Sequence, residues 1–300
     1  MTIDQLIMFK TVAESGSLRA ASELLHKTQP AISQGIRQLE SQLAVTLFNR
    51  DGYRLALTAE GKQIFQHAQR LLNEAAEIKQ VAQHLSGGNE ATITLAFEAA
   101  FDLSRILPVL EITQNEFPNT QIIIKQEYLT GAIEALDLGN ADIVISAAEI
   151  LQLQSGQLEL CLLHKGALID VASPMLILRH PDLRLSSELR NEYQIVVQDS
   201  GSGTRNIELG VQDGQRRWYV NDISTKKMLI QSGMGWGKLP DYLIEQDVES
   251  GSLVKLQLSD KQTHIELNYY AMKSKKHLLG PVASKLWKNL SLYSQHNRDL

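Results

Sequence analysis

The alternation of apolar and polar positions along the first 45 residues predicts three short helices. Residues 3–14 and 18–25 each carry apolar side chains at helical spacing. A third helix is expected from Thr28, a favourable N-cap residue, to about Leu43, with Pro30 in its first turn, where the missing N–H costs nothing. Two helices of this size joined by a tight turn are typical of proteins that place side chains in the major groove of DNA.

The third helix has an apolar side and a polar side. Its apolar positions, which we expect to face a core, are Ala31, Ile32, Ile36, Leu39 and Leu43. Its polar positions carry groups that hydrogen-bond to base edges or phosphates, and they are Gln29, Ser33, Gln34 and Arg37. A helical hairpin with a merely solvated polar face is the alternative interpretation.

The segment LFNRDGYRLALT, residues 47–58, predicts a short hairpin. Its two extended stretches flank Asp51-Gly52, a dipeptide that favours a tight turn. Arg50 and Arg54 stand on either side of this turn, so the hairpin is a candidate basic wing. The capped polar helix and the wing together argue for DNA binding and against the solvated hairpin.

Residues 59–85 predict a single long helix, because the stretch has no proline and its only glycine is Gly61. At 1.5 Å per residue this helix would span about 40 Å. Its apolar residues recur with the 4-3 spacing of a coiled-coil seam, which favours pairing with a second copy; burial against the chain's own domains is the alternative. The predicted dimerisation residues are Ile64, Ala68, Leu71, Ala75, Ile78, Ala82 and Leu85.

Beyond residues 86–90, a glycine-containing stretch that we expect to form a hinge, strands and helices alternate to the end of the chain. This alternation predicts an α/β fold with mainly parallel sheets, in which ligands bind beyond the carboxyl ends of the strands. Trp236 follows a Gly-rich turn, and its indole could stack on a planar ligand or could only seal a hinge. The candidate ligand-binding residues are Glu98, Ala100, Phe101, Thr130, Gly131, Ala147, Gln198, Ser200, Thr204, Asn221, Asp222 and Trp236.

Composition limits the class of protein. Three hundred residues with 43% hydrophobic content predict two or three globular domains. No apolar run approaches the roughly 18 residues of a membrane helix, and the N-terminus lacks a secretory pattern. The single Cys161 excludes an internal disulfide, and the eight histidines show no metal-ligand spacing. We therefore expect a cytoplasmic protein without membrane association, metal or cofactor.

The net charge of −5 argues against a strong electrostatic attraction to DNA. The acidic excess is concentrated in the C-terminal part, since residues 1–88 carry a net +1 and residues 89–300 a net −6. A nearly neutral N-terminal domain would bind DNA weakly by itself, because phosphate neutralisation supplies most non-specific affinity. We therefore expect several N-terminal domains to act together.

The segments AASELLHKTQPAISQGIRQLESQLAVTLFNR and LALTAEG resemble the winged helix-turn-helix of LysR-type transcriptional regulators. More loosely, ILPVLEITQNEFPNTQIII and ALDLGNADIVIS resemble the effector-binding domain of that family, which is similar to type 2 periplasmic binding proteins. The implied architecture is an all-α winged helix-turn-helix, a long linker helix and a two-lobed α/β effector domain. The implied boundaries are 1–58 for the DNA-binding domain, 59–88 for the linker and hinge, and 89–300 for the effector domain, with lobe I at about 91–162 and 268–300 and lobe II at about 163–267.

The resemblance also implies the function and the roles of individual residues. A regulator of this family acts as a homodimer or homotetramer on partly palindromic promoter DNA, with RNA polymerase as a further partner and a small-molecule effector between the lobes. Gln29, Pro30, Ser33 and Gln34 would approach the bases, while Arg50 and Arg54 would contact the backbone. The family commonly has a basic residue at position 34 and a polar one at 35; here Gln34 would favour adenine over guanine, and Gly35 weakens the helix.

The effector site departs from the family pattern near Ala100. Where the family often has a small hydroxyl residue suited to a carboxylate, this chain has Glu98 and Asp102. An anion would meet like charge there, so we expect a neutral or cationic effector, unless Glu98 only makes structural contacts. An enzyme or solute-binding protein would need a catalytic constellation or an export signal, and neither is visible; a purely architectural DNA binder would respond to no small molecule.

Overall fold

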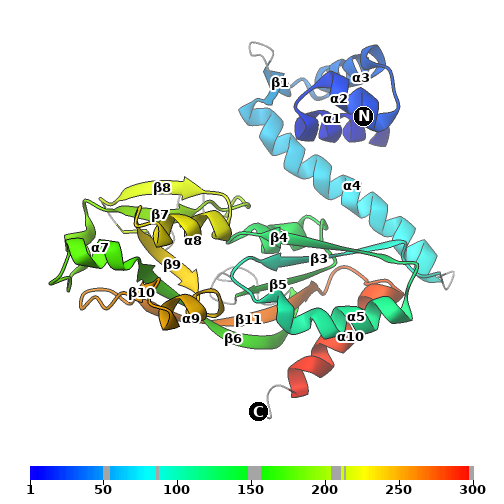
Figure 1. Ribbon diagram of the computed structural model, residues 1–300. Helices are drawn as coiled ribbons and strands as arrows, with labels where there is room; N and C mark the ends of the chain where they lie inside the picture. Colours follow the sequence, from blue (N-terminus) through cyan, green and yellow to red (C-terminus); the bar gives the residue numbers. More distant parts are fainter. Residues whose placement is uncertain (50–54, 86–87, 148–156, 204–210, 213, 297–300) are drawn as a thin grey trace. The chain divides into compact units, whose positions relative to one another are not determined.

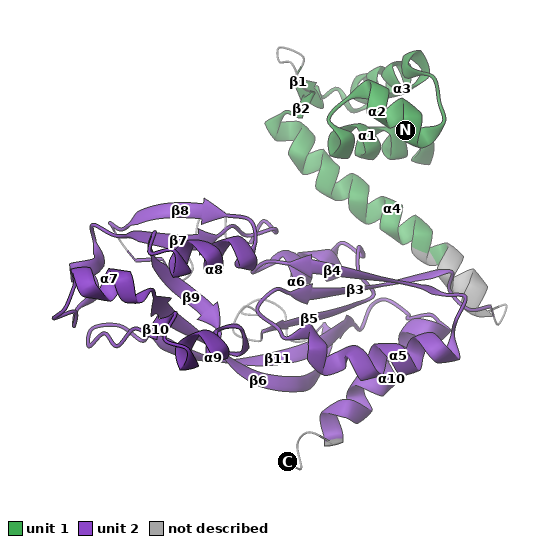
Figure 2. Cartoon of the chain, in the orientation of Figure 1, with its two compact units in different colours: residues 1–82 green, residues 83–300 purple. Residues whose placement is uncertain are grey.

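The computed structural model describes residues 1–49, 55–85, 88–147, 157–203, 211–212 and 214–296 (Figure 1). The chain divides into two compact units, Met1–Ala82 and Gln83–Leu300, which are green and purple in Figure 2. Each unit has hydrophobic clusters of its own and is described by itself.

The first unit is helical, with a small hairpin. Its elements are α1 (Ile3–Ser15), α2 (Leu18–Leu25), α3 (Gln29–Leu43), β1 (Phe48–Asn49), β2 (Ala56–Leu57) and α4 (Ala59–Leu85). The Thr28 hydroxyl accepts a hydrogen bond from the Ala31 N–H at 3.4 Å, as expected of an N-cap. Gly16 ends α1 with a φ of 68°, a left-handed conformation that glycine adopts without strain. The four predicted helices are thus confirmed, and α1, α2 and α3 begin at capping residues.

Aromatic rings fill the core of the first unit. The Phe9 ring meets Phe48 and Phe65 edge-on, with centroid distances of 5.5 and 5.9 Å. Ile32 and Leu39 of α3 are completely buried in the same cluster. Because Phe48 belongs to the hairpin and Phe65 to α4, this core fixes the positions of both relative to α3.

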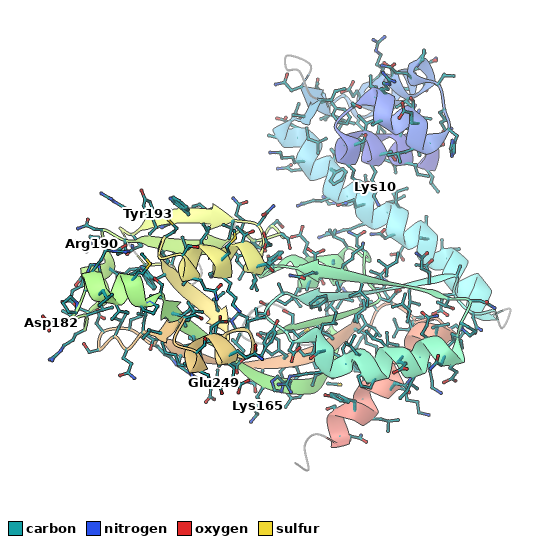
Figure 3. All side chains as sticks on the ribbon, in the orientation of Figure 1. Lys10, Lys165, Asp182, Arg190, Tyr193 and Glu249 are labelled. Carbon is teal, nitrogen blue, oxygen red and sulfur yellow. The ribbon has the colours of Figure 1, made fainter. Side chains whose placement is uncertain are left out.

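The second unit alternates strands and helices. Its strands are β3 (Thr92–Glu98), β4 (Gln121–Glu127), β5 (Ile143–Ala147), β6 (Leu158–Ala172), β7 (Tyr193–Val197), β8 (Arg216–Val220), β9 (Trp236–Pro240), β10 (Val254–Lys255) and β11 (His264–Ser274). Its α-helices are α5 (Leu107–Glu116), α6 (Gly131–Asp137), α7 (Pro174–Arg179), α8 (Ile223–Gln231), α9 (Asp241–Glu249) and α10 (Pro281–His296), with 3-10 turns η1 (Leu103–Ile106) and η3 (Ser186–Leu189). Side chains pack between these helices and the sheet (Figure 3).

The strands join in the order β4-β3-β5-β11-β6-β9-β7-β8, with β10 on β6. The sheet contains both parallel and antiparallel pairs, which corrects the expectation of mainly parallel strands. The parallel pairs join β3 to β4 and β5, and β7 to β8 and β9. The long strands β6 and β11 pair antiparallel with each other, and both predicted lobe boundaries fall inside them. The register shifts between Tyr269 and Tyr270, so a bulge lies close to these boundaries.

Separate hydrophobic clusters support each lobe. In lobe I, α5 and α10 cover one face of the sheet and α6 the other. In lobe II, one cluster lies under α8 and α9 and another under α7. Across the described ranges, no helix is both long and apolar enough to span a membrane.

Candidate DNA interface and effector site

Helix α3 presents the polar face that its sequence predicts. Ile32, Ile36 and Leu39 are buried in the core of the first unit. Ala31, which we expected on the core side, is exposed, because it lies in the first turn beside the Thr28 cap. Of the predicted DNA-contacting residues, Ser33 is half-buried, while those exposed are Gln29, Pro30, Gln34 and Arg37. Arg50 and Arg54 lie outside the described residues.

Gly35 has a packing role that the sequence did not reveal. The residue is buried, and an added Cβ would fall on the Sδ atom of Met8 in α1. The glycine therefore lets α1 and α3 approach closely, which accounts for a residue of poor helix propensity inside α3. Gly61 acts similarly, since a Cβ there would fall on the carbonyl oxygen of Leu47.

Glu40 positions the wing, and we did not identify it from the sequence. Its Oε1 accepts hydrogen bonds from the backbone N–H groups of Leu47, at 2.9 Å, and Phe48, at 3.4 Å. The Thr58 hydroxyl donates to the Thr46 carbonyl at 2.7 Å on the other side of the hairpin base. The only sequence signal was an acidic residue at the end of the polar helix face, shortly before the first wing strand.

Replacing Glu40 by alanine is expected to destabilise the first unit by about 1–3 kcal/mol, because two N–H groups at the wing base lose a charged acceptor. Urea denaturation measures this change. Glu40→Gln keeps one carbonyl acceptor and should lose less. Glu23→Ala is the matched control, since Glu23 is exposed and pairs with exposed Arg19, at 3.3 Å. Equal effects of Glu40→Ala and Glu23→Ala would contradict the positioning role.

The predicted dimerisation seam is only partly available on the surface of α4. Ala68 is 4% exposed and belongs to the core of the first unit, with Ile64 packed against that core. For Ala68, this burial favours the alternative of packing against the chain's own domain, and its part in pairing stays a prediction. Leu71 and Ile78 are 40% and 69% exposed. Ala75 is half-buried. The side chains of Ala82 and Leu85 lie outside the described residues.

Four of the predicted effector-binding side chains belong to hydrophobic clusters of the second unit. Phe101 is 1% exposed and packs on Tyr269, whose hydroxyl donates to the Ala100 carbonyl at 3.1 Å. Ala100 and Ala147 belong to the same cluster. Trp236 is fully buried in the cluster under α7, with the Lys261 ammonium 4.4 Å from its ring centroid. These four side chains pack against the protein's own core, and their contact with an effector stays a prediction.

The remaining candidates differ in environment. Gln198 and Asn221 are exposed. Asp222 caps α8 by accepting from the N–H and the hydroxyl of Thr225, both at 2.7 Å, and these hydrogen bonds lower its pKa. Thr204 lies outside the described residues.

Thr130 and Ser200 bring the two lobes into direct contact. Thr130, on lobe I, donates through its backbone N–H to the Asp199 Oδ1 of lobe II at 3.0 Å. Ser200, on lobe II, accepts from the Tyr128 N–H at 2.9 Å. Gly131 is buried at this junction. The sequence predicted that these strand ends face each other, but not that they bond to each other.

Carboxylates gather at a second junction of the lobes. The Tyr242 hydroxyl of lobe II lies 3.5 Å from the Phe101 carbonyl of lobe I. Burial raises the Tyr242 pKa to about 12, and the negative charges of Asp102, Glu98 and Asp241 contribute in the same direction. The electrostatic environment between the lobes is therefore acidic at this point.

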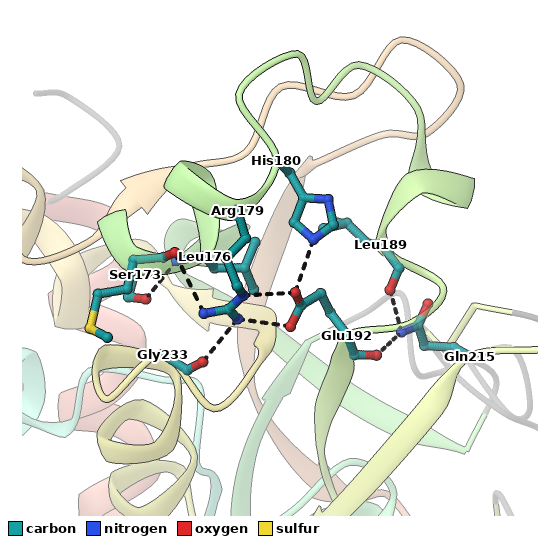
Figure 4. Close-up of polar contacts among 9 residues, drawn as sticks. Ser173, Leu176, Arg179, His180, Leu189, Glu192, Gln215 and Gly233 are labelled. Carbon is teal, nitrogen blue, oxygen red and sulfur yellow. Dashed lines mark hydrogen bonds and ion pairs between the residues drawn. The ribbon is translucent and has the colours of Figure 1, made fainter.

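A second polar network, in lobe II, is an ion-pair cluster (Figure 4). Arg179 contacts both carboxylate oxygens of Glu192, at 2.8 and 3.0 Å, and donates to the Gly233 carbonyl at 3.2 Å. His180 Nε2 lies 2.9 Å from Glu192 Oε1. The Arg179 hydrogen bonds lower the pKa of Glu192. This network ties the end of α7 to Glu192, which directly precedes β7, and to the turn before β9, so it links three segments of lobe II.

Comparisons with known proteins match both units. Residues 3–62 match the bacterial regulatory helix-turn-helix proteins of the lysR family, and residues 86–291 match the LysR substrate binding domain. The probable HTH-type transcriptional regulator YhaJ of Escherichia coli K12 is 29% identical over 254 residues, covering 84% of this chain and 85% of YhaJ.

Solved structures share the fold along the whole chain. Full-length AphB, a virulence activator of Vibrio cholerae, aligns with a TM-score of 0.58 at 20% identity, covering 98% of this chain and 100% of AphB. CbnR in complex with its target DNA aligns with a TM-score of 0.56 at 18% identity, covering 98% and 100%. With both domain matches in chain order over most of its length, the protein belongs to the LysR family of DNA-binding transcriptional regulators, with an N-terminal helix-turn-helix domain and a C-terminal effector-binding domain.

Proposed function

We propose that this regulator binds partly palindromic promoter DNA as a homodimer or a pair of dimers, through α3 and the wing. The observation that carries this proposal is the exposed polar face of the capped helix α3 in a unit whose net charge is close to zero. Because one such unit would bind weakly, two or more acting together supply the affinity. RNA polymerase would be the further partner, and the cytoplasm the compartment.

We further propose that the effector is a neutral or cationic small molecule bound between the lobes. Glu98 is 5% exposed at the end of β3 and lies in register beside Glu127 of β4. Ser146 of β5 is fully buried, and its hydroxyl has no hydrogen-bond partner among the described residues. Carboxylates accept hydrogen bonds from an ammonium or amide group and repel an anion in a poorly hydrated site.

Binding of the effector regulates DNA binding only if its affinity differs between two states of the protein. A change in lobe closure is the candidate difference, since the lobes meet at side chains from distant segments. This coupling would reposition paired DNA-binding domains and alter the register or bending of the promoter.

Gln34→Ala is expected to relax preference at one base pair of the operator by about 1–3 kcal/mol, because an exposed carboxamide on α3 suits bidentate recognition of adenine. Electrophoretic mobility shifts with single-base operator variants measure this discrimination. Gln42→Ala, which removes an exposed carboxamide from the last turn of α3, is the control. Unchanged discrimination by Gln34→Ala would refute the contact.

A DNase footprint tests the proposal as a whole. Purified protein is applied to DNA upstream of its own coding region, with and without a cell metabolite extract. Protection of separated half-sites on one helical face, altered by the extract, is the expected result. Absence of protection across a range of salt concentrations would overturn the proposal that α3 binds DNA. Protection that no extract fraction changes would overturn the proposal that a small-molecule effector regulates DNA binding.

A further inference from the structure

We propose that the Asp199 carboxylate is an internal ligand of lobe I, which holds one edge of the effector site closed and excludes anions from it. Asp199 follows β7 on lobe II, and its partner Thr130 follows β4 on lobe I. The Thr130 hydroxyl donates to Asp199 Oδ2 at 2.6 Å, and the Thr130 N–H donates to Oδ1 at 3.0 Å. The Gly201 N–H also donates to Oδ1, at 2.9 Å. The carboxylate thus bridges two donors on lobe I and one on its own loop.

Two flanking contacts run in the opposite direction, from donors on lobe II to carboxylates on lobe I. The Ser200 hydroxyl donates to Glu127 Oε2 at 2.6 Å. The Ser202 hydroxyl donates to Glu134 Oε2 at 2.7 Å, and its N–H donates to the same oxygen. We call this set the interlobe latch; it consists of Glu127, Thr130, Glu134, Asp199, Ser200 and Ser202.

Glycines permit the close approach of the two backbones at the latch. A Cβ at Gly201 would lie 2.6 Å from the Thr130 Oγ1 and 2.9 Å from the backbone N of Gly131. A Cβ at Gly131 would fall on the Ser200 hydroxyl. Leu129, just before Thr130, has a φ of 52°, a conformation that L side chains rarely adopt. The contact between the lobes therefore depends on the backbone conformation and the glycines of both segments, and not only on flexible side chains.

The latch decides which ligands this edge of the site accepts. The donors of Thr130 and Gly201 that could hold an external carboxylate already hold Asp199. An anionic ligand therefore has to displace Asp199 from these donors, whereas a neutral or cationic ligand near Glu98 does not compete with Asp199 for them. This consequence for effector choice rests on the proposed function, but the latch itself does not depend on DNA or an effector.

The test is to remove the Asp199 carboxylate by substitution and then to add formate, a free carboxylate that can occupy its place. Asp199→Gly is made in the full-length chain, in which Cys161→Ser removes the native thiol. Spin labels are attached at Lys125→Cys on β4 and Tyr219→Cys on β8, which are exposed positions on opposite lobes. The distance between the two labels is measured. We expect the parent protein to give a short, narrow distance distribution that formate does not change. The Asp199→Gly variant should give longer and broader distances, and sodium formate, but not sodium chloride at equal ionic strength, should restore the parent distribution.

Asp260→Gly is the matched control. Asp260 accepts from the N–H and the hydroxyl of Ser186, both at 2.8 Å, so it meets the same pair of donors but within lobe II. Its removal should leave the interlobe distance unchanged. If Asp199→Gly fails to fold, Thr130→Val removes only the hydroxyl and should still broaden the distribution.

An unchanged distance in Asp199→Gly, or in folded Thr130→Val, would overturn the latch. If the lobes of Asp199→Gly move apart and formate does not restore the parent distance, the role of the carboxylate as an internal ligand would be overturned. Because no DNA or effector is present in these measurements, their failure is distinct from failure of the footprint.

Discussion

Replacing Ile78 by glutamate is expected to convert the proposed dimer to monomers and to raise its dissociation constant by roughly 10²–10⁴-fold. Ile78 is 69% exposed on α4, in the part of the seam that the core of the first unit does not use. Burying an isoleucine in a helix pair contributes about 1.5–3 kcal/mol, and a two-fold dimer buries it twice. The substitution also places two carboxylates in the same apolar contact, and every 1.4 kcal/mol is tenfold in the dissociation constant.

Sedimentation equilibrium of the purified protein measures this change, and operator affinity should fall with it because single DNA-binding domains bind weakly. Leu178→Glu is the control, since Leu178 is 81% exposed on α7 and lies outside the seam. A dimer of normal affinity in the Ile78→Glu protein would place the pairing surface elsewhere.

Replacing Lys226 by methionine is expected to increase the free energy of unfolding at pH 7 by about 1–3 kcal/mol. Lys226 is 9% exposed on α8, and its Cε would lie 3.1 Å from a Cβ at Gly237. Burial lowers its pKa from 10.5 to about 8, while the charge of Asp170 opposes that shift and Lys238 adds to it. At about 1.36 kcal/mol per pKa unit, this shift corresponds to a cost of about 3 kcal/mol for keeping the ammonium charged, which methionine avoids.

The gain should depend on pH. Because the pKa of Lys226 is lower in the folded protein than in the unfolded chain, the unfolded state binds more protons between about pH 8 and 10.5. The contribution of Lys226 to stability therefore improves as the pH rises through this window, and the penalty is complete below about pH 8. The advantage of Lys226→Met over the parent protein should shrink accordingly from pH 7 to pH 10.

Urea denaturation of both proteins at the two pH values measures the difference. Lys227→Met is the control: Lys227 donates to the Leu243 carbonyl at 2.7 Å and pairs with Asp247, so its loss should not stabilise the protein. An equal or lower stability of Lys226→Met at pH 7 would show that the buried ammonium is compensated.

Sequence periodicity and caps determined the elements of the N-terminal unit of this protein in advance. Thr28, Pro30 and the apolar spacing predicted α3 to within a residue, and the absence of helix breakers predicted the full length of α4. These signals are local: a cap bonds within its own first turn, and an amphipathic helix shows its buried face in its own spacing. The match to the LysR family confirms the functional class that these elements indicated.

Only the tertiary structure decided which residues are available for function. Ala68 has the correct seam spacing but is covered by the core of the first unit, and Trp236 follows a glycine-rich turn but is buried under α7. Thr130 and Asp199 are 69 positions apart in the chain, yet they bond directly across the lobes. Local patterns specify elements because their interactions lie within one or two turns, whereas burial and cross-lobe pairing depend on segments that only folding brings together.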